Sequence, residues 1–346
     1  MKTIKFAVLG CGHIGKRHAE LIANHPYAEL VATIDPAINE FQVGSTRSRH
    51  FQNLSDFFKQ NLEIDVVNVC SPNGLHAKQA IQCLDQGYHV VIEKPIALNL
   101  TEANRILETA NKKQKQVFPV VQNRYAPTVQ WLKQMVEENA LGKIYMIQVN
   151  CFWNRDDNYY RKGNWHGTLA LDGGPLYTQF SHFIDLSNWI FGKMENIDAK
   201  FYNFNHQHNT EFEDSGIITF EVNGAAGTLS YTTSVSQSNF ESSITVIAEN
   251  GTVKIAGQYM DHLVYCQLKG DVPAKVSHLS SMIAHSHRTA ISNHQHFINN
   301  VVNVLNGLEN PKVQLQEGIA VVDCITNIYQ QRNTKKIKLA AEKSLV

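Results

Sequence analysis

Several residues of this chain have the types and spacing that chemistry on a bound nucleotide requires. Gly10, Gly12 and Gly15 give the spacing G-x-G-x-x-G directly after an apolar run. Backbone N–H groups at a helix start bind phosphate, and glycine lets the phosphate come close to the chain. Farther along, Lys94 could polarise a reacting oxygen and His182 could accept a proton.

The glycine spacing is weak evidence alone, because it also arises by chance. Here a predicted strand at 4–9 precedes it, a predicted helix at 14–24 follows it, and Asp35 stands 20 residues after Gly15. An acid in that position hydrogen-bonds the ribose hydroxyls and repels a 2′-phosphate, and neither Pro36 nor Ala37 supplies a cation to receive one. The pattern therefore favours NAD over NADP. The competing interpretation is a glycine turn with a structural role only.

Two further segments follow predicted strands and point to the same crevice, CSPNGLH at 70–76 and IEKP at 92–95. An ammonium group at such a strand end, beside the nicotinamide, can orient a reacting oxygen. Lys94 could instead be a solvated or Glu-paired lysine. The residues that we expect to contact the cofactor are Gly10, Gly12, His13, Ile14, Gly15, Asp35, Ser71, Pro72, Asn73, His76, Glu93, Lys94 and Gln122.

The elements that must position these residues follow from hydrophobic periodicity. Up to residue 123, short β-branched runs alternate with helical patterns, which predicts parallel strands joined by crossover helices. The strands are predicted at 4–9, 30–34, 66–69, 89–92 and 117–121, and the helices at 14–24, 54–60, 76–86 and 101–113.

The pattern changes near residue 125. A helix at 128–138, a strand at 144–152 and a helix at 175–191 precede four alternating runs, and helices at 292–305 and 315–331 close the chain. The turn signals Asn223-Gly224 and Asn250-Gly251 between the runs are typical of an antiparallel sheet.

Composition narrows the function classes. A length of 346 residues favours two domains, and 31 basic against 31 acidic residues give no field that would attract nucleic acid. The six cysteines are scattered without a C-x-x-C pair, which fits a reducing cytoplasm. No apolar run reaches the roughly 18 residues of a membrane span, and a strand starts too early to leave room for a signal peptide. We expect a soluble cytoplasmic protein that does not bind membranes.

His182 lies in the predicted helix at 175–191. Thr178, His182 and Asp185 recur at spacings of four and three residues and so lie along one polar edge. Asp185 could orient the imidazole and leave its other nitrogen available for a proton. A single helical histidine is otherwise more often a satisfied core or surface residue.

With these residues in view, the chain resembles the Gfo/Idh/MocA family of sugar oxidoreductases. The motifs that carry the resemblance are GCGHIGKRH, Asp35, SPNGLH, EKP, NRY at 123–125 and DGGPLYTQFSHFIDLSNWIFG at 172–192. The resemblance implies an α/β protein, with an N-terminal Rossmann domain, a doubly wound parallel sheet, at 1–123. It further implies a C-terminal α+β domain with an open, mainly antiparallel sheet at 124–346, which binds substrate and mediates oligomerisation. It assigns catalysis to Lys94, followed by Pro95 that is often cis, and to His182.

The position four residues before the catalytic histidine is an aspartate in many relatives that oxidise inositol or hexoses, but here it is Thr178. The run WNRDDNYYRKGNWHGT at 153–168 instead resembles the branch that oxidises C3 of UDP-N-acetylglucosaminuronic acid in surface-polysaccharide synthesis, although His166 replaces the more usual arginine. Arginine forks suit oxyanions and aromatic rings suit stacking, so this loop fits an anionic sugar nucleotide. The residues predicted to contact substrate are Lys94, Asn123, Arg155, Tyr160, Trp165, Thr178, Gln179 and His182.

Other interpretations stay open at this point. The basic, aromatic loop could be an interface, the substrate could be a free sugar or inositol, and the protein could be a non-catalytic NAD-binding regulator. His285, His287, His294 and His296 are crowded together, but no nearby cysteine or carboxylate in the sequence completes a tetrahedral set, so we predict no metal. We expect a homodimer or homotetramer.

Overall fold

The computed structural model describes residues 1–44, 46–270 and 293–343. It divides into two compact units, which we treat separately: the first unit holds residues 1–122 with 293–322, and the second holds residues 123–270 with 323–343. The family resemblance implied that 293–322 belongs to the C-terminal domain. The structure groups this segment with the first unit, because α9 (His294–Leu305) packs against α1 (His13–Ala23).

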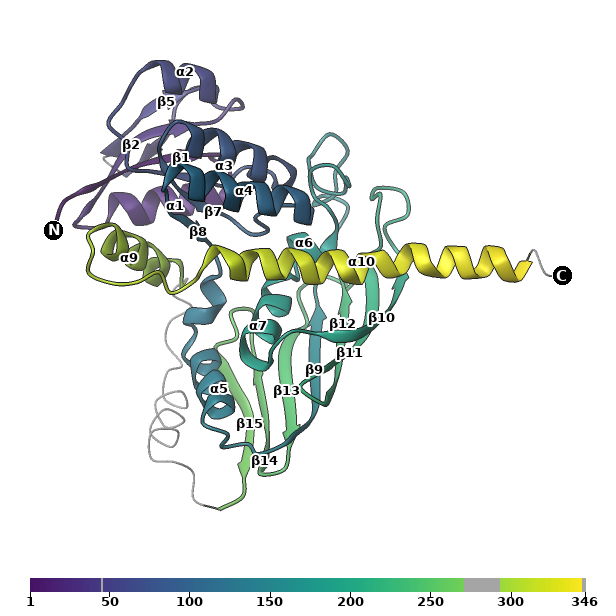
Figure 1. Cartoon of the computed structure of the whole chain (residues 1–346). Coiled ribbons are helices and arrows are strands. Elements are labelled where there is room, and N and C mark those ends of the chain that lie inside the picture. Colours follow the sequence, from purple (N-terminus) through teal and green to yellow (C-terminus); the bar gives the residue numbers. More distant parts are fainter. Residues whose placement is uncertain (45, 271–292, 344–346) are drawn as a thin grey trace. The chain divides into compact units, whose positions relative to one another are not determined.

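The first unit is built around a six-stranded sheet of order β5-β2-β1-β6-β7-β8, in which every pairing is parallel. The strands are β1 (Ile4–Leu9), β2 (Ala28–Ile34), β5 (Arg49–Phe51), β6 (Val66–Val69), β7 (His89–Ile92) and β8 (Val117–Pro119). The crossovers contain α1, α2 (Leu54–Lys59), η1 (Asn73–Leu75), α3 (His76–Asp85) and α4 (Leu100–Lys113). This is the predicted doubly wound Rossmann sheet, visible in Figure 1.

Local sequence explains where these helices begin. The side chains of Asn53 and Asn99 accept the backbone N–H of Asp56 and Glu102, so each forms the N-cap of its helix with an acid three residues later. The predicted strands at 4–9, 66–69 and 89–92 match the observed bounds. Strand β5 and the short pair β3 (Gln42–Val43) and β4 (Thr46–Arg47) were not predicted, because two- and three-residue strands leave no periodic signal.

The second unit contains a seven-stranded sheet of order β10-β11-β12-β9-β13-β14-β15. Its strands are β9 (Ile144–Phe152), β10 (Glu195–Tyr202), β11 (Ser215–Val222), β12 (Ala225–Thr232), β13 (Glu241–Ala248), β14 (Gly251–Ala256) and β15 (His262–Leu268). All pairings are antiparallel except that of β9 with β12, so the sheet is mainly antiparallel as predicted, with more strands than the four runs seen in the sequence.

One face of this sheet is covered by helices. Figure 1 shows α5 (Pro127–Glu137) and α7 (Ser181–Phe191) lying over the strands. The Phe180 ring lies 5.2 Å from that of Tyr231 on β12, and Trp153, just beyond β9, lies 6.0 Å from Phe183. Helix α10 (Leu315–Lys343) runs on well past the predicted end at residue 331. Among the described residues, no helix combines the length and the apolar character needed to cross a bilayer.

The predicted single helix at 175–191 is two helices in the structure. α6 (Pro175–Thr178) ends before Gln179, and α7 begins at Ser181. Two side-chain contacts accompany the break: Thr178 donates to Asp172, and Gln179 donates to the hydroxyl of Tyr159. Thr178 and His182 therefore lie on two successive helices rather than on the single helix predicted from the sequence.

Candidate functional site

The residues predicted to bind the cofactor lie at the carboxyl ends of neighbouring strands in the first unit. The backbone N–H of Gly10 donates to the carbonyl of Ile34 at 2.8 Å. In the same way, the N–H of Cys70 donates to the carbonyl of Leu9 at 2.7 Å, and the N–H of Glu93 donates to the carbonyl of Val69 at 3.0 Å. These bonds join the loops after β1, β2, β6 and β7 into one edge. The sheet topology thus brings the glycine turn, Asp35, the 70–76 segment and Lys94 together, as the parallel arrangement requires.

The glycine turn is shaped by its own backbone. Gly10 has φ +90°, and a Cβ there would stand 2.7 Å from the carbonyl of Cys70. A Cβ on Gly15 would overlap the carbonyl oxygen of Gly10, whereas one on Gly12 would meet nothing within 4 Å. Gly12 is also the N-cap of α1, which has no side-chain cap and no acidic residue in its first turn. No side chain of this helix therefore competes with an anion, so the turn fits a pyrophosphate.

The two glycines should respond differently to alanine substitution. In Gly15→Ala the methyl group collides with backbone, so we expect a loss of about 1–3 kcal/mol of stability and a lower melting temperature without ligand. In Gly12→Ala we expect a melting temperature close to wild type but a rise in the Kd for NAD on the order of tenfold. Thermal unfolding and a fluorescence titration with NAD measure both effects. A Gly12→Ala protein that melts below Gly15→Ala would contradict this division of roles.

Asp35 is tied into the turn as well as placed for a ribose. Its Oδ2 accepts the N–H of Cys11 (2.7 Å) and its Oδ1 accepts the N–H of Ala37 (2.8 Å). A carboxylate has further acceptor capacity, so these bonds are compatible with a ribose hydroxyl. Burial first, and then the Asp35 charge, raise the pKa of the Cys11 thiol to about 12, so this cysteine stays protonated.

His76 joins the loops after β6 and β7. It is 1% exposed, with Nδ1 2.7 Å from the carbonyl oxygen of Pro95 and Nε2 2.7 Å from that of Ser71. The peptide between Lys94 and Pro95 is cis, as the family resemblance led us to expect. His76 was predicted to contact the cofactor, and the structure shows that it also holds the backbone beside Lys94.

In the second unit, the loop at 153–168 folds onto the α6–α7 segment. The guanidinium of Arg155 lies 5.0 Å from the ring centres of both Trp153 and Tyr159. Gln179 donates its amide to the Tyr159 hydroxyl at 2.9 Å. The structure thus brings two predicted substrate residues, Arg155 and Gln179, to the two sides of Tyr159.

Tyr159, rather than Tyr160, links these groups. The Tyr160 ring is 2% exposed and lies 5.0 Å from His206 and 6.2 Å from Phe212, so it packs in the interior of the second unit. The Trp165 ring stacks on His166 at 3.8 Å. Sequence reasoning chose between two adjacent tyrosines without a signal that separates them, because only the fold decides which ring turns inward.

Thr178 is paired with a buried carboxylate. It donates to Asp172, which is 0% exposed and also accepts the N–H of Gly167 at 2.9 Å. Asp172 therefore places a carboxylate directly beside Thr178. Asp172 is the first residue of the motif at 172–192, but it was not predicted as a site residue.

His182 is 8% exposed on α7, one turn before Asp185. Asp185 accepts two hydrogen bonds from Arg124, one from Nε (2.9 Å) and one from the terminal nitrogen (2.6 Å). The guanidinium also lies 5.1 Å from the ring centre of Trp189. The proposed orientation of His182 by Asp185 stays a prediction. The structure adds Arg124, which the NRY motif at 123–125 contained and which sequence reasoning did not pair with Asp185.

Removing Arg124 should destabilise the second unit. Both members of the pair are less than one-tenth exposed, so Arg124→Met leaves a buried carboxylate without its counter-charge. Such a change costs about 3–5 kcal/mol, whereas replacing both partners costs far less. We therefore expect a clear drop in the midpoint of urea unfolding for Arg124→Met and a partial recovery for Arg124→Met with Asp185→Leu. With Asp185→Leu measured alone as well, a loss in the double variant equal to the sum of the two single losses would show that the pair carries no coupling.

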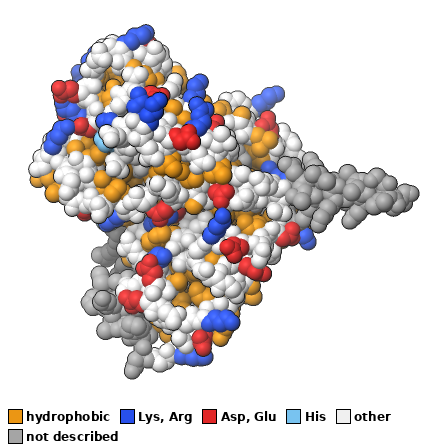
Figure 2. All heavy atoms as spheres, in the orientation of Figure 1, with side chains coloured by type: hydrophobic (Ala, Val, Ile, Leu, Met, Phe, Trp, Pro, Cys, Tyr) orange, Lys and Arg blue, Asp and Glu red, His pale blue; other side chains and the backbone are white. Residues whose placement is uncertain are grey.

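The surface bears charges of both signs. On the face drawn in Figure 2, basic and acidic side chains are interspersed rather than gathered by sign. With 31 basic and 31 acidic residues in the sequence, this distribution gives no extended field for a polyanion.

The comparisons with known proteins agree with this architecture. Residues 4–120 match the model of an oxidoreductase family with an NAD-binding Rossmann fold, and residues 129–254 match the GFO/IDH/MocA C-terminal domain. The chain is 31% identical to the WlbA dehydrogenase from Bordetella pertussis, whose crystal structure holds NADH and UDP-GlcNAcA. That match covers 96% of each chain with a TM-score of 0.86.

Curated relatives match more locally. The D-glucoside 3-dehydrogenase of Escherichia coli (strain K12) is 28% identical over 55% of this chain and 54% of its own length. The glucose-6-phosphate 3-dehydrogenase of Bacillus subtilis (strain 168) is 31% identical over 54% of this chain and 53% of its own length. The chain thus spans about half the length of these curated relatives. The chain belongs to the Gfo/Idh/MocA family of oxidoreductases, and its residues 4–120 form that family's NAD-binding Rossmann domain.

Proposed function

We propose that this protein oxidises the C3 hydroxyl of UDP-N-acetylglucosaminuronic acid to the 3-keto sugar, with NAD as the hydride acceptor. The observation that carries the proposal is the 31% identity, over 96% of both chains, to a dehydrogenase crystallised with NADH and UDP-GlcNAcA. Surface-polysaccharide synthesis is the pathway, and the cytoplasm the compartment, that we expect for this reaction.

The chemistry divides between two side chains. Bound NAD supplies the acceptor for the hydride that leaves C3. His182 accepts the proton of the C3 hydroxyl, and general base catalysis of this kind contributes typically 10²–10⁴-fold. Lys94 stabilises the negative charge that develops on the oxygen as the C=O bond forms. The products are the 3-keto sugar, NADH and the protonated base.

The second unit supplies groups suited to an anionic sugar nucleotide. The Arg155 guanidinium lies 5.0 Å from two aromatic ring centres and donates one terminal nitrogen to the Asn154 carbonyl, and a guanidinium in such a site suits a carboxylate or phosphate. Asn123 and Gln179 are 4% and 3% exposed, and each has a buried side-chain oxygen without a hydrogen-bond partner in the described chain. Buried polar atoms of this kind favour a polar ligand such as a sugar. We propose Asn123, Arg155, Trp165, Thr178 and Gln179 as positioning residues for it.

The competing candidate is a dehydrogenase of a free sugar or inositol, which the 25% identity, over 65% of this chain, to a myo-inositol 2-dehydrogenase favours. To separate the two, the purified protein is incubated with NAD and, in turn, UDP-N-acetylglucosaminuronic acid, UDP-N-acetylglucosamine, glucose and myo-inositol. NADH absorbance and the product mass are recorded, with 2-oxoglutarate added in parallel because NADH could be reoxidised in place. Turnover of the uronate alone supports the proposal, and turnover of a free sugar instead overturns it. NAD binding without any turnover would favour a regulator.

A homodimer or homotetramer remains our expectation. The open face of the second unit's sheet exposes apolar side chains, including Met146 and Ile247, which stand directly opposite each other on β9 and β13, and Ile217 on β11. Exposed apolar groups on a sheet face favour association with another copy.

A further inference from the structure

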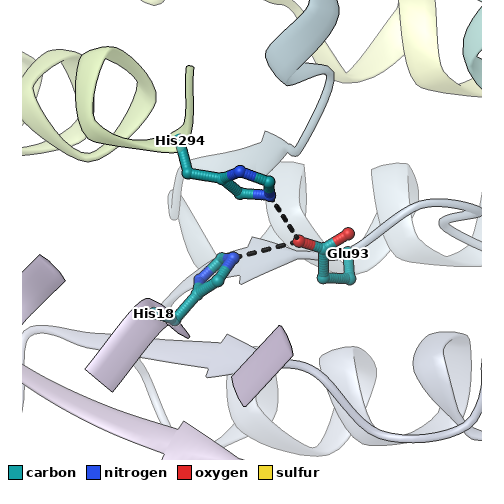
Figure 3. Close-up of side chains that lie close together, drawn as sticks. All are labelled: His18, Glu93 and His294. Carbon is teal, nitrogen blue, oxygen red and sulfur yellow. Dashed lines mark hydrogen bonds and ion pairs between the residues drawn. The ribbon is translucent and has the colours of Figure 1, made fainter. Parts of the chain in front are cut away.

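A buried cluster of two histidines and a carboxylate lies directly beside Lys94 in the first unit. His18 on α1 is 0% exposed, Glu93 after β7 is 4% exposed and His294 at the start of α9 is 2% exposed. Figure 3 shows both imidazoles directed at the Glu93 carboxylate. The proposed chemistry does not use these side chains, yet burying three ionisable groups is costly unless they interact.

Each ring nitrogen of His18 has one polar contact, and these two contacts fix the orientation of the ring. Its Nε2 lies 3.0 Å from Glu93 Oε1, and its Nδ1 lies 2.9 Å from the amide nitrogen of Asn68, which is 0% exposed. A carboxylate oxygen can only accept, so the Nε2 that faces it carries a proton. His18 therefore donates to Glu93.

His294 approaches the same carboxylate from a segment about 200 residues away in the sequence. Its Nε2 lies 3.7 Å from Glu93 Oε1, and its ring meets that of His18 edge to face at 5.7 Å. Burial by itself raises the pKa of Glu93, but the hydrogen bond from His18 and the close approach of His294 oppose this and bring the pKa well below its usual value. The cluster thus holds an ionised carboxylate in the interior.

The other carboxylate oxygen reaches the proposed catalytic lysine. Glu93 Oε2 accepts the backbone N–H of Lys94 at 3.1 Å. On the far side of Lys94, the carbonyl of Pro95 is 2.7 Å from His76 Nδ1. The backbone of Lys94 is therefore fixed on both sides by side chains that are themselves buried.

Two imidazoles and a carboxylate are also a ligand set for a transition metal, and their ligating atoms lie within 4.8 Å of one another. A metal ligand must offer a lone pair to the metal, whereas Nε2 of His18 lies at hydrogen-bond distance, 3.0 Å, from the Glu93 carboxylate itself. The arrangement therefore favours a hydrogen-bonded cluster over a metal centre.

We propose that Glu93 is a positioning residue for Lys94 and that His18 and His294 hold it in place, an inference that rests on the proposed function of Lys94. A catalytic group must be held within a fraction of an ångström, and a displacement of 1 Å can cost about 10²-fold in rate. Through His294, the segment at 293–322 takes part in setting the position of the lysine.

The test uses His294→Ala, His294→Gln and Glu93→Gln in the full-length protein, with His296→Ala as the matched control. His296 is exposed and lies on the same helix. We expect kcat to fall at least tenfold in His294→Ala and Glu93→Gln, and the KM for NAD in His294→Ala to stay within about twofold of wild type. We expect partial recovery in His294→Gln, because an amide nitrogen can still donate to the carboxylate. A kcat of His294→Ala equal to that of the control overturns the proposal.

A second readout does not depend on the substrate. Reductive methylation of the folded proteins at fixed pH, followed by peptide mass spectrometry, gives the labelling rate of Lys94. We expect this rate to change in His294→Ala and Glu93→Gln and to stay the same in His296→Ala. If the wild-type protein oxidises none of the sugars, the proposed function fails while the labelling still tests the positioning. Unchanged labelling in all variants, or one equivalent of zinc in the purified protein that is lost in His294→Ala, overturns it.

Discussion

Lys94→Met is expected to lower kcat by at least about 100-fold with the uronate substrate while leaving the Kd for NAD within about threefold. The substitution keeps the apolar stem of the side chain and removes the ammonium that stabilises charge on the reacting oxygen. The backbone of Lys94, held by Glu93 and His76, should keep its place. Steady-state kinetics and a titration of the apoprotein with NAD measure the two quantities.

The matched control is Lys78→Met, which removes an exposed lysine from α3 of the same unit. Its rate should equal that of wild type. If Lys94→Met turns over at the control rate, then Lys94 is the solvated or paired lysine of the alternative interpretation. The proposed mechanism then lacks the group that stabilises negative charge on the reacting oxygen.

His182→Asn should produce a loss of similar size, about 10²–10⁴-fold in kcat, because it removes the group proposed to accept the hydroxyl proton. Asparagine is polar and of similar size, so the packing of α7 around position 182 should survive. Circular dichroism and thermal unfolding check the fold, and single-turnover kinetics measure the chemical step apart from product release. The control is His208→Asn, since the side chain of His208 is 64% exposed.

The losses in kcat caused by Lys94→Met and His182→Asn should not be independent of each other. Groups that act on the same proton and the same oxygen behave as a unit, so the double variant is expected to be little slower than either single variant. A loss equal to the product of the two single losses would instead mean that Lys94 and His182 act in separate steps.

The sequence alone determined those features that local chemistry controls. The glycine spacing, the strand before it, the helix after it and Asp35 lie within 32 residues, and glycine is required at positions 10 and 15 because any Cβ would strike backbone. Strands β1, β6 and β7 were placed from their apolar runs, because buried parallel strands have a continuous apolar signal. Since parallel strands end at one sheet edge, the grouping of Gly12, Asp35 and Lys94 also followed.

The tertiary structure determined the features that depend on contacts between side chains far apart in the sequence. The break between α6 and α7 is one such feature: Thr178 at the end of α6 donates to Asp172 and Gln179 donates to Tyr159, whereas periodicity alone extends one helix through both residues. The pairing of Arg124 with Asp185 and the approach of His294 to Glu93 join residues 61 and about 200 positions apart. No local pattern encodes such pairs, because their free energy comes from burial and charge neutralisation that exist only once the chain has packed.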